Sequence, residues 1–226
     1  MIRAWGYTLV EMMVGMTVSL IVLASSLALF TVNTEFGTKQ LQNDFLRTQL
    51  NTIADTMKNE IARAGFCFDC TFVNPFIHVD AAGASSSILI DDSASKVDAG
   101  KCIRFAYNHD KRTGAMSLNK DDAKGYRLGR DSNNNPVIET YENWKGLTNW
   151  SCGSDSSSGG ISGYWRDMTF DRLYLESLNF KRSIFDGVAS KNKIQTVEVT
   201  LSASLKNDRT IKDTVTFTVY LPNVGT

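Results

Sequence analysis

The sequence lacks most of what an enzyme site needs. It contains only two histidines, His78 and His109, well separated along the chain, so histidine-based catalysis has little to work with. It also has no nucleophile elbow, no HExxH pair, no Walker loop and no dinucleotide-binding glycine motif. These absences favour a structural or binding protein over an enzyme, with no cofactor and no metal expected.

A net charge is also absent. Lys plus Arg and Asp plus Glu both total 24, so the chain as a whole gives no argument for nucleic acid. Residues 101–130 are locally basic, with eight basic side chains against three acids. They form either a solvated face of a sheet or a surface for a partner or DNA, so nucleic-acid binding stays open. The eight are Lys101, Arg104, Lys111, Arg112, Lys120, Lys124, Arg127 and Arg130.

One long segment, residues 12–32, contains no charged side chain. As a helix rising ~1.5 Å per residue it spans the ~30 Å hydrocarbon core of a bilayer. Arg3 precedes it and should stay cytoplasmic, which places the rest of the chain outside the cytoplasm. A cleaved signal peptide and a plain membrane anchor share this layout. Neither explains Glu11, because an ionised carboxylate in an apolar helix costs at least ~2.5 kcal/mol.

The stretch Gly6-Tyr7-Thr8-Leu9-Val10-Glu11, followed by the apolar run, resembles the type IV prepilin signal. In that family a prepilin peptidase cuts after the glycine, and the new N-terminus is methylated. The resemblance implies cleavage between Gly6 and Tyr7 and methylation of Tyr7, where the family more often has Phe. It also implies that Glu11 pairs with the terminal amine of a neighbouring subunit. Such a buried pair compensates for lost hydration only when both partners are present, so it would signal correct assembly.

Beyond the apolar segment, the apolar residues become periodic. This pattern predicts an amphipathic helix over residues 33–64, with one face packed on a partner. Gly65 is typical of a helix end. The apolar positions are Phe36, Leu41, Phe45, Leu46, Leu50, Ile53, Met57 and Ile61.

From about residue 84 the pattern alternates with a period of two, which predicts strands. The clearest two, 196–203 and 214–221, flank a turn at 206–209 and predict an antiparallel hairpin with one face on the helix. Residues 131–135 loosely resemble a calcium loop but are predicted as a turn, because Pro136 stands where such a loop has glycine. A long helix followed by an antiparallel sheet is an α+β fold. Earlier strands are expected at 87–90, 102–107, 125–128 and 137–141.

Four cysteines, Cys67, Cys70, Cys102 and Cys152, follow the apolar segment. An even number in an exported chain favours two disulfides. Cys67 and Cys70 form a CxxC that would also suit a redox motif or half a zinc site. A redox motif expects a preceding strand rather than a helix, and a zinc site lacks a second closely spaced ligand pair. Cys67–Cys70 with Cys102–Cys152 is placed first among three connectivities, which the sequence does not decide.

The head also resembles the PilW family of minor pilins, in Ala64-Gly65-Phe66-Cys67, in residues 102–105 with 125–128, and in the closing Val219-Tyr220-Leu221-Pro222-Asn223. The architecture expected from this resemblance is type IV pilin-like. It has a leader peptide over residues 1–6, an apolar transmembrane and assembly helix over 7–32, an amphipathic helix over 33–64 and a head over 65–226.

The PilW resemblance implies a minor pilin that is held in the inner membrane, with its head in the periplasm, before it enters a pilus. There it would start assembly at the tip, with adhesion, twitching or DNA uptake as downstream outcomes. The implied partners are other minor pilins, the major pilin, prepilin peptidase, the inner-membrane assembly platform, a tip adhesin and inner-membrane lipid. PilW proteins are similar to the J-type minor pseudopilin of type II secretion, which is the near alternative. A membrane-tethered periplasmic enzyme or binding module is the remote one.

Overall fold

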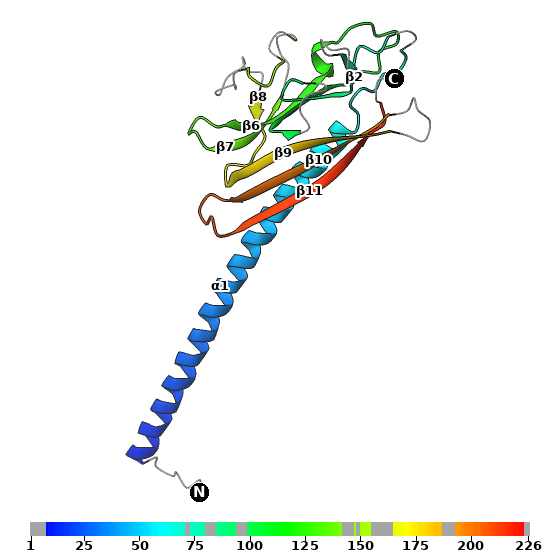
Figure 1. The fold of residues 1–226 in the computed structure, drawn as a ribbon. Helices are drawn as coiled ribbons and strands as arrows, with labels where there is room; N and C mark the ends of the chain where they lie inside the picture. The colour runs from blue at the N-terminus through cyan, green and yellow to red at the C-terminus, as the bar shows by residue number, and fades with distance from the viewer. Residues whose placement is uncertain are drawn as a thin grey trace. The chain divides into compact units, whose positions relative to one another are not determined.

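The computed structural model describes residues 8–70, 73–79, 85–93, 99–141, 147, 150–154, 165–186 and 193–223. The chain divides into two compact units, Met1–Phe45 and Leu46–Thr226. One long helix, α1 (Leu9–Ile61), runs through both and precedes every strand of the described chain. All strand pairs are antiparallel. The predicted α+β class, with a long N-terminal helix followed by antiparallel sheets, is therefore confirmed (Figure 1).

The first unit contains the N-terminal part of α1, and its apolar side chains are exposed. Every large apolar side chain from Leu9 to Val32 is more than half exposed within this chain. Of the helices described, α1 is the one long and apolar enough to cross a membrane. An apolar surface of this extent needs lipid or other protein around it, because soluble monomers rarely expose one.

In the second unit, one stripe of α1 is buried by the head. Leu46, Leu50, Met57 and Ile61 are fully buried, and their spacing places them on one side of the helix. Turn residues follow α1 from Ala62, so the helix ends slightly before the predicted residue 64. Gly65 has φ +74°, and a Cβ there would lie 2.6 Å from the carbonyl oxygen of Asn223. Glycine is required at this position because it alone accepts both the conformation and the close approach.

Four strands form a sheet in the order β11-β10-β9-β4. The predicted hairpin is confirmed, since β10 and β11 pair from Gln195↔Leu221 to Ser204↔Lys212. Val197, Val199 and Leu201 on one face of β10 are fully buried. Figure 1 shows β9, β10 and β11 lying across the second-unit part of α1, so the main core lies between helix and sheet. The strands are β4 (Ala99–Gly100), β9 (Leu173–Asp186), β10 (Lys193–Leu205) and β11 (Lys212–Leu221).

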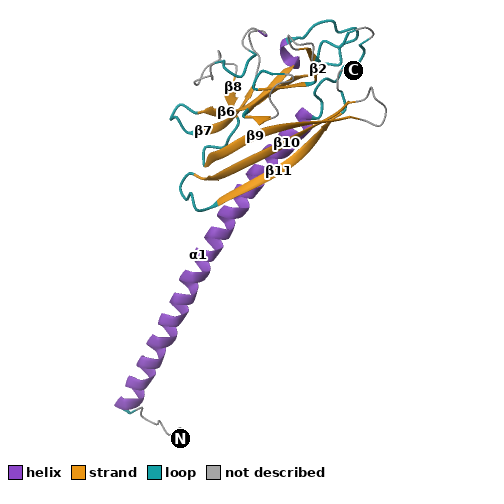
Figure 2. Cartoon of the chain, in the orientation of Figure 1, coloured by secondary structure: helices purple, strands orange, loops and turns teal. Residues whose placement is uncertain are grey.

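The second sheet has the order β3-β5-β6-β7-β8. Figure 2 labels its strands β6, β7 and β8, which are neighbours in this order. Its strands β3, β5, β6 and β7 correspond to the four earlier strands expected from alternation. The segment between β6 and β7 is a turn, as predicted, in which the Asp131 carboxylate accepts the backbone N–H groups of Asn133 and Asn135. The strands are β3 (Ile88–Ile90), β5 (Cys102–Ala106), β6 (Ala123–Arg130), β7 (Pro136–Tyr141) and β8 (Trp165–Asp167). A separate pair is formed by β1 (His78–Val79) and β2 (Ser85–Ser86), and η1 (Lys120–Asp122) is a short 3₁₀ helix.

Candidate functional site

The Glu11 side chain caps the start of α1. Its carboxylate accepts the backbone N–H of Thr8 at 2.9 Å and the Thr8 hydroxyl at 3.0 Å. In return the Glu11 backbone N–H donates to the Thr8 hydroxyl oxygen at 3.3 Å. This reciprocal arrangement is a capping box, which satisfies donors that the first turn of a helix leaves unpaired. The acid also suits the positive end of the helix dipole.

Capping gives Glu11 a local role that the sequence analysis did not identify. Both hydrogen bonds that Glu11 accepts in the described chain go to the same oxygen, Oε2. Thr8 is therefore a site residue that sequence reasoning missed, although a Thr three residues before a Glu at a helix start is a recognisable signal. Gly6 and Tyr7, where processing is predicted, lie outside the described residues.

The head contains two disulfides, Cys67–Cys70 and Cys102–Cys152. This is the pairing that the sequence analysis placed first among the three possibilities. The first bridge closes a short loop that follows the end of α1. The second joins β5 to residues 150–154, a segment that lies between β7 and β8 in sequence.

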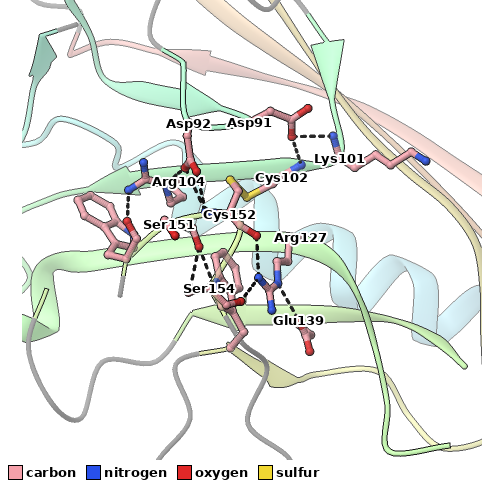
Figure 3. Close-up of a disulfide and its surroundings, with 12 residues drawn as sticks. Asp91, Asp92, Lys101, Cys102, Arg104, Arg127, Glu139, Ser151, Cys152 and Ser154 are labelled. Atoms are coloured by element: carbon pink, nitrogen blue, oxygen red, sulfur yellow. Dashed lines mark hydrogen bonds and ion pairs between the residues drawn. A yellow bond between two sulfur atoms is a disulfide. The ribbon is translucent and has the colours of Figure 1, made fainter. Parts of the chain in front are cut away.

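Asp92 and Arg104 hold the beginning of residues 150–154 beside the second disulfide (Figure 3). The Asp92 carboxylate accepts the backbone N–H of Cys152 at 3.0 and 3.1 Å and the Arg104 Nε–H at 2.5 Å. Arg104 also donates from Nη1 to the Trp150 carbonyl, and its guanidinium lies 4.9 Å from the centroid of that ring. Burial lowers the pKa of Arg104, and the neighbouring Asp92 carboxylate opposes the shift.

Arg127, on β6, holds the other end of the same segment. Its Nε–H donates to Glu139 at 2.7 Å, while Nη1 donates to the carbonyls of Cys152 at 2.7 Å and Ser154 at 2.5 Å (Figure 3). The guanidinium also lies 4.5 Å from the centroid of the Trp165 ring. The Glu139 side chain is only 2% exposed, so its charge depends on Arg127 for compensation.

These contacts correct the interpretation of the basic stretch 101–130. Arg104 and Arg127 are almost fully buried and paired with acids from outside the stretch, and Arg112 pairs with the buried Asp122. The region is therefore not a uniformly solvated face. It also offers less free positive charge to nucleic acid than the sequence count suggested, because paired cations are already neutralised.

Two other polar groups connect parts of the head. The Tyr107 hydroxyl donates to Glu60 at 2.6 Å, which ties the residue after β5 to the end of α1, and burial raises the pKa of this tyrosine. The His78 ring lies 5.2 Å from the ring of Trp150, and burial, with a smaller contribution from Arg104, lowers its pKa to about 4. Among the residues that the structure describes, no group of three or more His, Cys, Asp or Glu side chains is placed to hold a metal ion.

Comparison with known families shows where the chain belongs. Residues 39–221, most of the chain, match the family model of prepilin peptidase-dependent protein B, PpdB. The chain belongs to the PpdB family. It is therefore a pilin-like substrate of prepilin peptidase, although the match does not single out PilW. Searches of curated proteins and of solved structures found no match.

The PpdB match and the N-terminal signal come from separate parts of the chain, and both indicate processing by prepilin peptidase. The match begins at residue 39, after the apolar segment, whereas the signal ends at Glu11. In a PpdB-family chain the exposed apolar part of α1 also has a physical reason, since it anchors the protein in a membrane.

Proposed function

We propose that this PpdB-family chain is a minor pilin of a type IV pilus, processed between Gly6 and Tyr7 and assembled through Glu11. The observation that carries the proposal is a carboxylate at the start of an exposed apolar helix, with one oxygen engaged by Thr8. The second oxygen is the proposed acceptor for the methylated amine of Tyr7 in a neighbouring subunit. Both charges leave water on assembly, so each stabilises the filament only when the other is present.

The place of the chain in the filament follows from its resemblance to PilW. That resemblance supports a subunit at the tip, which starts assembly with other minor pilins and the inner-membrane platform, and which a tip adhesin would contact. Before assembly the head would lie in the periplasm. The J-type pseudopilin of type II secretion remains the alternative, because processing by prepilin peptidase is common to both.

Glu11→Gln tests the assembly role while preserving the cap. Glutamine supports a capping box, so export and helix content should stay normal. Incorporation into sheared surface filaments should fall by at least about tenfold, because removing one partner of a desolvated ion pair costs several kcal/mol. The measurement is a quantitative immunoblot of filaments against membranes.

Glu35→Gln is the matched control for that experiment. Glu35 lies on the same helix and pairs with Lys39 at 2.7 Å, with both side chains well exposed. Exposed pairs contribute little, so incorporation should stay at the wild-type level. Normal incorporation of Glu11→Gln would overturn the proposed role of Glu11.

Mass spectrometry of the mature protein from isolated surface filaments tests processing and location together. The mature chain should begin at a methylated Tyr7, and Gly6→Ala should retain the leader. An unchanged mature mass in Gly6→Ala would contradict the cleavage site. Recovery only in a secretion machine, and never in surface filaments, would favour the pseudopilin.

A further inference from the structure

Within the residues that the structure describes, the strand β11 has a neighbouring strand on one of its two edges. In the described chain β10 is its one partner. The Leu205 N–H donates to the Ile211 carbonyl at 3.1 Å, which marks the odd-numbered residues as the bonded positions of this hairpin. Bonded and non-bonded pairs alternate in an antiparallel ladder. The N–H and C=O groups of Thr216, Thr218 and Tyr220 therefore point away from β10.

Side-chain contacts support this assignment independently. The Thr214 N–H donates to the Asp213 carboxylate at 2.8 Å, so this even-numbered amide also faces away from β10. The hydroxyls of Thr214 and Ser202 are 2.9 Å apart, a closeness expected of a non-bonded pair. The Asp213 side chain thus satisfies the outward amide of Thr214 and leaves those further along β11 to other partners.

The free edge of β11 is long and lacks the usual protection. Proteins guard their edges with short strands, charges, prolines or bulges. The other edge strands of the described sheets have two or three residues, whereas β11 has ten. Its charges, Lys212 and Asp213, stand at its start, and Pro222 follows its end. Residues 214–221 contain no charge, glycine or proline and are mainly β-branched or aromatic, which favours pairing with another strand.

The inner face of β11 is also incompletely covered. Val215 and Phe217 are partly exposed, while their cross-strand partners Leu201 and Val199 are fully buried. A strand added beside β11 would cover this apolar margin and complete its hydrogen bonds. The fitting partner is an extended segment with apolar side chains on the inner face and polar ones on the outer face.

We propose that β11 is a docking edge for strand addition by a different subunit of the same filament, an inference that rests on the proposed function. A second copy of this chain fits poorly if its β11 pairs antiparallel, as every strand pair described in the head does. The Asn223 amide donates to the Ala64 carbonyl at 3.2 Å, so the end of β11 lies at the end of α1, and both elements run in the same direction through the head (Figure 1). Antiparallel pairing of two β11 strands would turn their helices in opposite directions, whereas helices inserted from one membrane point the same way.

Two adjacent proline substitutions in the full-length protein test the edge. Thr218→Pro removes an outward amide, and Val219→Pro removes an amide that bonds to β10. Proline is tolerated in edge strands where its missing N–H faces outward. In detergent, Thr218→Pro should keep a near wild-type melting temperature while Val219→Pro lowers it. In cells, Thr218→Pro should reduce incorporation into filaments at least about fivefold, because a proline cannot donate to an added strand.

Hydrogen exchange of the wild-type protein provides a readout that does not depend on a variant folding. The outward amides of β11 should exchange at least about tenfold more slowly in isolated filaments than in the free full-length chain, because pairing protects them. Equal exchange rates in filaments and in the free chain would overturn strand addition. The proposed function would still stand if incorporation into filaments depends on Glu11. Absence of the chain from filaments would instead overturn the proposed function itself.

Photo-crosslinking identifies the occupant of the edge. A photoreactive phenylalanine analogue in place of Tyr220, which is 55% exposed beside the free edge, should form an adduct with a different subunit in assembled filaments. An adduct between two copies of this chain would overturn the choice of occupant.

Discussion

Single residues decide the stability of the head where charges are buried in pairs. Arg127 and Glu139 are 10% and 2% exposed, whereas Arg209 and Glu176 form a similar pair that is much more open to solvent. Arg127→Ala leaves the Glu139 carboxylate buried without its partner, and should lower the free energy of unfolding by about 3–5 kcal/mol. Arg209→Ala, the surface control, should cost at most about 1 kcal/mol. Urea unfolding measures both, and equal losses would contradict this account.

His78 makes the stability of the head depend on pH. Burial lowers its pKa from 6.5 to about 4, so the folded chain keeps this ring neutral. The unfolded chain takes up a proton below pH 6.5, and the folded chain does so only near pH 4. The contribution of His78 to stability should therefore be complete above pH 6.5 and be lost as the pH drops from 6.5 towards 4.

His78→Gln should flatten that pH dependence in urea unfolding between pH 7 and pH 4. The other histidine, His109, provides a matched control because 46% of its side chain is exposed. His109→Gln keeps the buried ring of His78, so the fall in stability towards pH 4 should persist in this variant. A slope that flattens in His109→Gln and not in His78→Gln would contradict the role given to His78.

At the scale of elements, a disulfide and two arginines act together on residues 150–154. Replacing both Cys102 and Cys152 by Ser should lower the free energy of unfolding by about 2–4 kcal/mol, since the bridge closes a loop that is otherwise free in the unfolded chain. The folded head should persist because the Asp92 and Arg127 contacts remain. The same change at Cys67 and Cys70, which are separated by 3 residues rather than 50, should cost less. Chemical denaturation followed by tryptophan fluorescence compares the two.

The longest strand, β9, shows where sequence patterns fail. Its buried apolar residues are Leu173 and Leu175 and then Leu178 and Phe180, so the alternation changes phase. The cause is a bulge, since Leu175 pairs with Ala203 and Ser177 with the preceding Ser202. The resulting three-residue step hides a strand from period-two reasoning. By contrast, residues 196–203 of β10 and 214–221 of β11 alternate without interruption, and both strands were predicted.

The candidate site was predictable only where its signal is local. Glu11 stands out because it is an acid next to an apolar run, and the capping Thr8 is three residues away. The pairing of Arg127 with Glu139 depends instead on the register between two strands. No pattern within either strand encodes that register, so charges that compensate each other inside the head looked like a basic surface.

The whole molecule combines a unit with an exposed apolar helix and a unit with a closed core. If both are needed in a filament, a chain lacking residues 1–30 and exported with an unrelated cleavable signal should be soluble yet absent from filaments. The reason is that the apolar surface and Glu11 are removed while the core residues from Leu46 onward are kept. Immunoblots of filament and periplasmic fractions measure this. Full complementation by the truncated chain would instead indicate a tethered binding module.

The Cys102–Cys152 bridge has a mechanical consequence. It closes a covalent ring across a sequence separation of 50, and that ring contains β6 and β7. When the chain is pulled by its two ends, tension passes through the sulfur atoms and bypasses both strands. At ~3.4 Å per extended residue, the stretched polypeptide stays roughly 170 Å shorter than its residue count would give. A reducing agent releases that hidden length.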